Sequence, residues 1–252
     1  MFENTLIRAS AFGQIMTNPR AKVDKEADGL SKTAKSYLFR TYIAEKYDRE
    51  KDITTKHMAK GISQEGEGIE MLSKYYDKPF EKNQDRYSNE FITGHPDIIS
   101  ENDTGDMHLH DIKLSWDIWT FLPNIIEPLN EHYFYQLQAY FWLTGAKTGE
   151  INYLLVDASE KLIQDEKYKL LRQMDVVSEE SIEYIEAAAQ VEINMIYPDI
   201  PIEEKVLTFP VERDDEVIER MKIKVIKCRE YLQEIADLHK GFNHRFIANK
   251  FM

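Results

Sequence analysis

Residues 94–113, GHPDIISENDTGDMHLHDIK, contain the strongest indication of a fold in this chain. They complete one apolar run, about residues 90–99, and contain a second, about residues 107–114, and both runs have the length of a β-strand. Between the runs, residues 102–106 (NDTGD) are turn-forming residues. The sequence therefore predicts an antiparallel hairpin near the middle of the chain.

Two carboxylates and a lysine lie on this hairpin. Asp97 ends the first strand, and hairpin pairing would bring it close to Asp111 on the second. Because side chains alternate between the faces of a strand, Asp111 and Lys113 share one face, and His108 and His110 share the other. Carboxylates bind divalent cations, and a lysine beside the ion can orient an attacking water. The hairpin therefore suggests a metal-dependent phosphodiesterase centre, although an exposed strand with a salt bridge would contain the same three residues.

Two helices could supply groups that the hairpin lacks. Glu65 begins an amphipathic helix, and Glu67 and Glu70 compete with it for the role of a third carboxylate. Glu65 and Glu67 cannot both serve, because successive residues of an α-helix point about 100° apart. Gln136 and Tyr140 share a face of a later helix, where Gln136 could hold a water or a phosphate. The alternatives are an acidic first turn that favours the helix dipole and an aromatic-rich core helix.

The rest of the chain indicates helices around a small sheet. We expect Ser10 to cap a short N-terminal helix, and Ser31 and Ser178 to cap two of the longer ones, which span about 31–46, 54–76, 129–144, 178–197 and 212–240. Further strands are expected at about 80–87 and 151–157. This order predicts an α/β fold with a small mixed central sheet flanked by helices and with extra N- and C-terminal helices. We expect one domain, 1–252, with a core at about 54–157 and a helical extension at about 175–252.

The composition limits the classes of function. The single cysteine, Cys228, excludes a disulfide framework and a cysteine-rich metal site. A formal net charge of −13 argues against a general nucleic-acid binder, but it permits a nuclease whose phosphate contacts are confined to a groove. The N-terminal residues do not resemble a signal peptide, and no apolar run approaches membrane-spanning length. We therefore expect no membrane partner and a cytoplasmic protein.

Several short motifs follow one another in a recognisable order. Taken together, they resemble the PD-(D/E)xK nuclease superfamily, and more narrowly the phage lambda-type recombination exonucleases and their YqaJ-like relatives. The resemblance covers roughly residues 8–157, and we identify no motif of the family in residues 158–252. The motifs that carry it are Arg8-Ala9-Ser10, the GxxxE of Gly61–Glu65, Pro96-Asp97, the DxK of Asp111–Lys113 and the glutamine-containing segment Tyr133–Gly145.

The resemblance implies a restriction-endonuclease-like core and a specific set of ligands. Mg²⁺ or Mn²⁺, as one or two ions, would be bound by Glu65, Asp97, Asp111 and the carbonyl oxygen of Ile112. Lys113 would act on the attacking water, assisted by a glutamine. The remaining expected site residues are that glutamine, Gln136, and the DNA contacts Arg8, Ser10 and Tyr140.

The resemblance also implies a function. It predicts an exonuclease that hydrolyses phosphodiester bonds at double-stranded DNA ends for phage-type recombination, in a bacterial or phage-infected cell. A single-strand annealing protein is a possible partner, and a homo-oligomer is possible. An endonuclease of the same fold and a non-catalytic DNA-binding or assembly protein stay open as alternatives.

Two further features have other interpretations. His108-Leu109-His110-Asp111 is similar to the zinc motif HxHxDH, but the spacing differs and strand alternation separates the histidines from Asp111. We expect these histidines to be packed under a helix or half exposed. Trp116, Trp119 and Phe121 could stack on bases at a DNA end, but we expect them to belong to the core.

Overall fold

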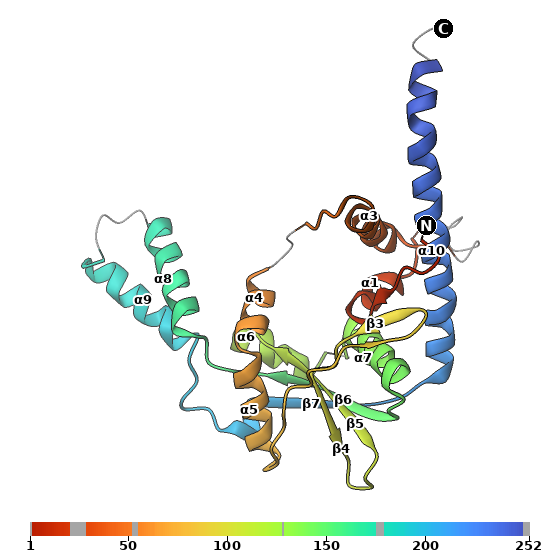
Figure 1. Ribbon diagram of the computed structural model, residues 1–252. Helices are drawn as coiled ribbons and strands as arrows, with labels where there is room; N and C mark the ends of the chain where they lie inside the picture. Colours follow the sequence, from red (N-terminus) through yellow and green to blue (C-terminus); the bar gives the residue numbers. More distant parts are fainter. Residues whose placement is uncertain (1, 21–28, 52–54, 128, 175–178, 249–252) are drawn as a thin grey trace.

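A four-stranded mixed sheet lies at the centre of the molecule (Figure 1). The computed structural model describes residues 2–20, 29–51, 55–127, 129–174 and 179–248. The strand order is β4-β5-β6-β7, in which β5 is antiparallel to β4 and parallel to β6, and β7 is antiparallel to β6. The strands are β4 (Ile98–Glu101), β5 (Met107–Leu114), β6 (Thr148–Leu154) and β7 (Val206–Glu212). The predicted hairpin is therefore confirmed as β4 and β5.

The first predicted strand of the hairpin divides between two sheets. β3 (Ile92–Gly94) belongs to a second, three-stranded sheet with the order β1-β3-β2, and the chain then leaves it before β4 begins. Pro96 lies in this break and has no N–H to donate to a ladder. The partners of β3 are β1 (Ile7–Arg8), which is parallel to it, and β2 (Tyr87–Ser88), which is antiparallel. The strand predicted at 80–87 is wrong except at its last residue.

One helix covers each face of the central sheet. α5 (Glu65–Tyr75) buries Ile69 and Leu72 against the face that contains Ile112. α7 (Glu131–Thr144) packs on the opposite face, where Phe141 joins Leu109 in the larger core. Apolar residues therefore hold β5 from both sides. The predicted α/β class, a small mixed sheet flanked by helices, is confirmed.

The single helix predicted at 54–76 is divided into two at a glutamine that binds a neighbouring loop. α4 (Lys56–Ser63) and α5 meet at Gln64, three residues beyond the break expected near Gly61. The Gln64 side chain donates to the Asp157 carbonyl at 2.6 Å and accepts from the Ser159 N–H at 3.2 Å. The position of the break follows from these long-range contacts and not from the glycine.

The N-terminal helices differ from the prediction at Ser10. This residue lies inside a short 3₁₀ helix, η1 (Ala9–Ala11), and Ala11 precedes α1 (Phe12–Ile15), so Ser10 does not cap a helix. The expected cap at Ser31 is confirmed, because its hydroxyl accepts from the Ala34 N–H at 3.0 Å at the start of α3 (Lys32–Tyr47).

The C-terminal part of the chain is not only helical. It contributes β7 to the central sheet, so the predicted helical extension is corrected in this respect. An unpredicted helix, α8 (Glu160–Met174), pairs with α9 (Ile182–Ile193), and the two project from the body of the molecule (Figure 1). Ser181 caps α9, and the expected cap Ser178 lies outside the described residues.

The last helix, α10 (Asp215–Ala248), packs along α3 and α7 before its end projects away from the body (Figure 1). Short helical turns complete the chain: α6 (Ile118–Phe121), η2 (Leu122–Ile125) and η3 (Ile202–Glu204). Trp116 and Phe121 are buried in the core, as expected, whereas Trp119 is 61% exposed. Among the described residues, no helix combines the length and the apolar character needed to cross a bilayer.

Candidate active site

The β4–β5 hairpin brings two carboxylates together. Ile98 pairs with His110 in the antiparallel ladder. Asp97 precedes Ile98 and Asp111 follows His110, so these two aspartates lie opposite each other. Asp97 Oδ2 accepts the backbone N–H of Ile112 at 2.8 Å, which fixes its carboxylate against β5. Asp111 is 1% exposed. The expected proximity of these two residues is therefore present in the fold.

Lys113 lies on the same face of β5 as Asp111. Its Nζ is 2.7 Å from Asp111 Oδ2 and 3.4 Å from Gln136 Oε1, and it lies over the Tyr133 ring. Gln136 in turn donates to Asp111 Oδ1 at 3.3 Å and to the Tyr140 hydroxyl at 2.9 Å. α7 thus places its glutamine and tyrosine, one turn apart, directly above the carboxylate–lysine pair.

The structure distinguishes the three glutamates that compete for the helix position. Glu65, the first residue of α5, lines the same cleft as Asp97 and Lys113, and Lys82 Nζ lies 2.6 Å from its carboxylate. Glu67 and Glu70 face a different hollow on the far side of the helix. Of the three glutamates, Glu65 is therefore the one that lines the cleft with Asp97 and Lys113.

A cleft of about 700 Å³ opens over these residues. Arg8 and Ser10, from the N-terminal segment, line it together with Tyr140. Two basic residues in the segment before β2, Lys82 and Arg86, also line it. They were missed because the sequence there favoured a strand, and nothing in its spacing indicates that the chain bends toward the carboxylates.

The electrostatics of the cleft reflect charges held out of water. Burial, and then the neighbouring Asp111 carboxylate, raise the pKa of Asp97 to about 7. Burial likewise raises the pKa of Asp111, against the opposing effect of Lys113. Burial alone would lower the pKa of Lys113, but the two carboxylates outweigh it and raise that pKa. The site therefore stabilises positive charge at this point.

The donor set fits a divalent cation. Asp111 Oδ2 is buried, and the ammonium of Lys113 lies 2.7 Å from it. Two neighbouring buried carboxylates repel each other, and a divalent cation would offset that repulsion. Asp97 lies beside Asp111, and Glu65 lines the same cleft, so this part of the fold offers carboxylate oxygens of the type that Mg²⁺ and Mn²⁺ prefer.

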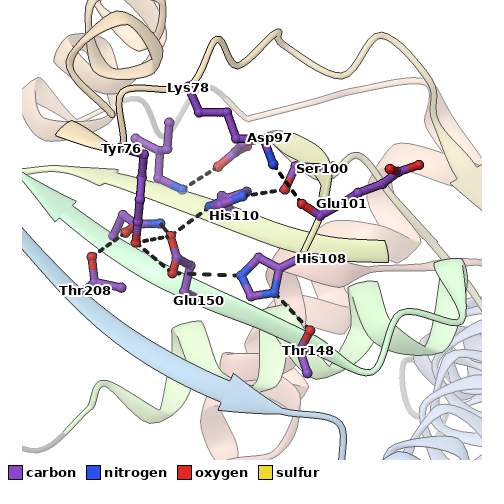
Figure 2. Close-up of polar contacts among 12 residues, drawn as sticks. Tyr76, Lys78, Asp97, Ser100, Glu101, His108, His110, Thr148, Glu150 and Thr208 are labelled. Atoms are coloured by element: carbon purple, nitrogen blue, oxygen red, sulfur yellow. Dashed lines mark hydrogen bonds and ion pairs between the residues drawn. The ribbon is translucent and has the colours of Figure 1, made fainter. Parts of the chain in front are cut away.

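The two histidines of the hairpin lie on the opposite face of β5. There they meet Glu150 of β6, which the sequence did not single out (Figure 2). Glu150 was missed because the strand was predicted to begin at 151, whereas β6 begins at Thr148. Strand alternation correctly separated His108 and His110 from Asp111, but it could not indicate their partner on the next strand.

The fold and the cleft together define an α/β protein with a buried carboxylate–lysine centre. A phage-related exonuclease from Haemophilus somnus 129PT has the same fold, with a TM-score of 0.71 and 24% identity over 93% of this chain and 97% of its own. An alkaline exonuclease from Laribacter hongkongensis superposes with a TM-score of 0.60 and 14% identity over 97% of this chain and 96% of its own. A structure of that alkaline exonuclease with dAMP gives a TM-score of 0.59.

A scan against protein-family models and a search of curated proteins returned no match. The similarity to the two exonucleases therefore rests on the arrangement of sheets and helices over nearly the whole of each chain. The predicted resemblance to phage-type exonucleases is confirmed at the level of the fold.

Proposed function

We propose that the chain is a divalent-metal-dependent DNA exonuclease that hydrolyses phosphodiester bonds at duplex ends. The observation that carries this proposal is the buried group of Asp97, Asp111 and Lys113 at the floor of a cleft with basic walls. The fold shared with two solved exonucleases supports it. The L. hongkongensis enzyme was solved with dAMP, and we propose that the substrate of this chain is DNA.

In this mechanism Glu65, Asp97, Asp111 and the carbonyl of Ile112 would hold Mg²⁺ or Mn²⁺. The ion would supply Lewis-acid activation of the phosphodiester and of the attacking water. Lys113, on the same strand face as Asp111, would orient that water and offset the charge that develops on the phosphate. Gln136 would position the water or a phosphate oxygen, because its amide already links Asp111 to Tyr140.

The walls of the cleft would hold the DNA strand. Arg8 and Ser10 line the cleft from the N-terminal segment, and Tyr140 lines it from α7, so together they would contact the backbone of one bound strand. Lys82 and Arg86 add positive charge on the wall formed by the segment before β2. This local charge would provide the phosphate contacts that the net charge of −13 makes unavailable over the surface as a whole.

The test is digestion of linear duplex DNA labelled at its 5′ or 3′ ends, with and without Mg²⁺. The wild-type chain should degrade the ends only with the metal, and Asp111→Asn should lose that activity while keeping its folded circular-dichroism spectrum. Asp103→Asn, in the exposed β4–β5 turn, is the matched control and should digest DNA at the wild-type rate. If Asp111→Asn digests DNA at the wild-type rate, the proposed nuclease centre is wrong.

A closed circular duplex in the same experiment separates the alternatives. An exonuclease leaves it intact, whereas an endonuclease of the same fold nicks it. A chain that cleaves neither substrate and binds no Mn²⁺ in calorimetry would be a DNA-binding or assembly protein. We further propose that residues 1–252 act as one nuclease domain in phage-type recombination, inside a bacterial or phage-infected cell. An annealing-protein partner and a homo-oligomer belong to the same proposal.

A further inference from the structure

His108, His110 and Glu150 form a second cluster of metal-ligand type, on the face of β5 opposite Asp111 (Figure 2). One atom of each lies within 4.8 Å of the others. His110 Nδ1 is 2.7 Å from Glu150 Oε1, and His108 Nε2 is 3.8 Å from Glu150 Oε2. The strand geometry explains the cluster. His108 and His110 are two residues apart on β5 and therefore share a face, and His110 pairs directly with Glu150 of β6.

Each imidazole is oriented by a hydrogen bond at the ring nitrogen that faces away from Glu150. His108 Nδ1 lies 2.9 Å from the Thr148 hydroxyl, and His110 Nε2 lies 2.8 Å from the Ser100 hydroxyl. In metal-binding histidines the nitrogen that does not bind the metal makes such a hydrogen bond, which fixes the tautomer and the plane of the ring. Both rings here therefore direct their remaining nitrogen toward the Glu150 carboxylate (Figure 2).

The carboxylate is held in the same way. Glu150 accepts the Tyr76 hydroxyl at 3.0 Å and the Asn152 amide at 3.0 Å, and Asn152 is itself fixed by the Thr208 hydroxyl at 2.8 Å. Burial alone would raise the pKa of Glu150, but the two histidines and Asn152 outweigh it and hold that pKa below its usual range. The carboxylate and the two imidazoles are thus held in place by hydrogen bonds before any ion arrives.

We propose that His108, His110 and Glu150 bind a transition-metal ion of the Zn²⁺ class, separate from the oxygen-ligand site of the nuclease centre. Two imidazoles and one carboxylate are a ligand set for Zn²⁺ and related transition metals, whereas Mg²⁺ prefers oxygen ligands alone. Zn–N and Zn–O bonds of about 2.0–2.2 Å place tetrahedral ligand atoms roughly 3.3 Å apart. The observed separations of 2.7 and 3.8 Å lie on either side of this value, so small side-chain movements suffice.

The location of the site suggests what the ion does. It joins β5 to β6, and His110 is the residue immediately before Asp111. The ion would therefore fix the strand that carries the carboxylate–lysine pair without touching the cleft. His108, whose side chain is 19% exposed, provides the approach from solvent.

The experiment titrates the full-length chain, stripped with a chelator and supplied with excess Mg²⁺, with Co²⁺ as a spectroscopic probe. We expect saturable, stoichiometric binding with the visible absorption of low-symmetry Co²⁺, displaced by Zn²⁺ and accompanied by a rise in Tm. His108→Ala should lose this binding. Thr148→Val, which keeps all three ligands, should weaken it by about 10–100-fold.

Two variants make the result specific. His239→Ala removes a histidine on α10 that contacts Tyr42, far from the cluster in sequence, and should bind Co²⁺ as the wild type does. Asp111→Asn should also keep the Co²⁺ site even if it abolishes DNA digestion, which makes this test independent of the proposed nuclease activity. Absence of Co²⁺ and Zn²⁺ binding by the wild-type chain would overturn the proposal and leave a hydrogen-bonded cluster. Binding that His108→Ala leaves unchanged, or that Asp111→Asn abolishes, would overturn it as well.

Discussion

At the residue scale, two carboxylates share one ammonium group in the floor of the cleft. Asp97 and Asp111 lie side by side, and Lys113 Nζ is the cation at 2.7 Å from Asp111. Buried charges of one sign are unfavourable unless a cation accompanies them. The three side chains therefore behave as a unit, whose charge balance depends on the lysine and on any divalent ion that binds.

Replacing Lys113 with alanine should affect both stability and activity. The substitution leaves two buried carboxylates without their cation, which costs about 3–5 kcal/mol of unfolding free energy in a chelator at pH 8. Mg²⁺ should restore much of that loss, whereas digestion of duplex ends should remain about 10²–10⁴-fold slower. Urea unfolding with and without Mg²⁺, together with the digestion rate, measures the two effects.

Lys74→Ala is the matched control for that variant. Lys74 forms an exposed ion pair with Glu70 on the outer side of α5. Its removal should measurably change neither the free energy of unfolding nor the rate of DNA digestion, because exposed ion pairs are screened by solvent. A Lys113→Ala protein as stable as Lys74→Ala would show that the ion pair in the cleft is not energetically significant.

Asp97 should make the metal-free protein less stable as the pH rises. Its pKa is about 7 in the folded chain, through burial and then Asp111, against about 3.9 in an unfolded chain. The folded state therefore binds more protons between these values, so the free energy of unfolding should fall from about pH 4 to about pH 7. Mg²⁺ should reverse the trend, because a cation favours the ionised carboxylates.

Asp97→Asn tests this dependence, since an amide does not titrate. Urea unfolding across that pH range in a chelator should give a flatter profile for Asp97→Asn than for the wild type. Asp103→Asn, in the exposed turn, should keep the wild-type profile. If the wild type becomes more stable with rising pH in the same range, the carboxylates are ionised without a metal and the proposed linkage is absent.

At the scale of elements, β5 can carry the carboxylate–lysine pair in a buried position because a different helix covers each of its faces. α7 brings Gln136 and Tyr140 to the face with Asp111, while α5 packs on the face with Ile112. The close approach of α7 depends on a residue without a side chain. A Cβ at Gly149 of β6 would lie 2.7 Å from the Leu109 carbonyl oxygen and 3.0 Å from the Phe141 ring.

Gly149→Ala should therefore separate the sheet from α7. The added methyl meets backbone on one side and an aromatic ring on the other, so overpacking should cost about 1–3 kcal/mol and slow DNA digestion by displacing Gln136. Gly66→Ala, in the first turn of α5, has open space around the new methyl and should be neutral or stabilising. Thermal melts of both variants give the comparison, and equal Tm values would contradict the predicted crowding.

At the scale of the whole molecule, the cleft is assembled from segments that lie far apart in the chain. Arg8, Glu65, Arg86, Lys113 and Tyr140 come from different elements, and all line one cavity. The central sheet supports this cleft, and its last strand, β7, begins at Val206. The C-terminal part of the chain is thus needed for the sheet, even though it contributes no predicted site residue.

Truncation after residue 174 should test this dependence. The fragment lacks β7, so β6 becomes an edge strand with unpaired backbone groups, and buried residues such as Ile151 and Leu154 lose their cover. We expect aggregation or loss of the cooperative unfolding transition. Truncation after residue 241 removes only the end of the projecting α10 helix and should leave the Tm close to that of the full chain. A cooperatively folded 1–174 fragment would contradict the structural role of β7.

The sequence by itself determined the local features whose signals lie within a few residues. The NDTGD turn, the alternation along β5 and the cap at Ser31 were predicted correctly, because turn chemistry and side-chain periodicity are properties of neighbouring residues. The ordered motifs further predicted a fold that the two solved exonucleases share.

Only the tertiary structure decided how distant segments meet. That Glu65, and not Glu67 or Glu70, lines the cleft depends on which side of α5 faces the hairpin. The pairing of His110 with Glu150 depends on the register of two parallel strands that lie 40 residues apart in the chain. Such contacts are set by packing and by backbone pairing between elements, neither of which leaves a local pattern in the sequence.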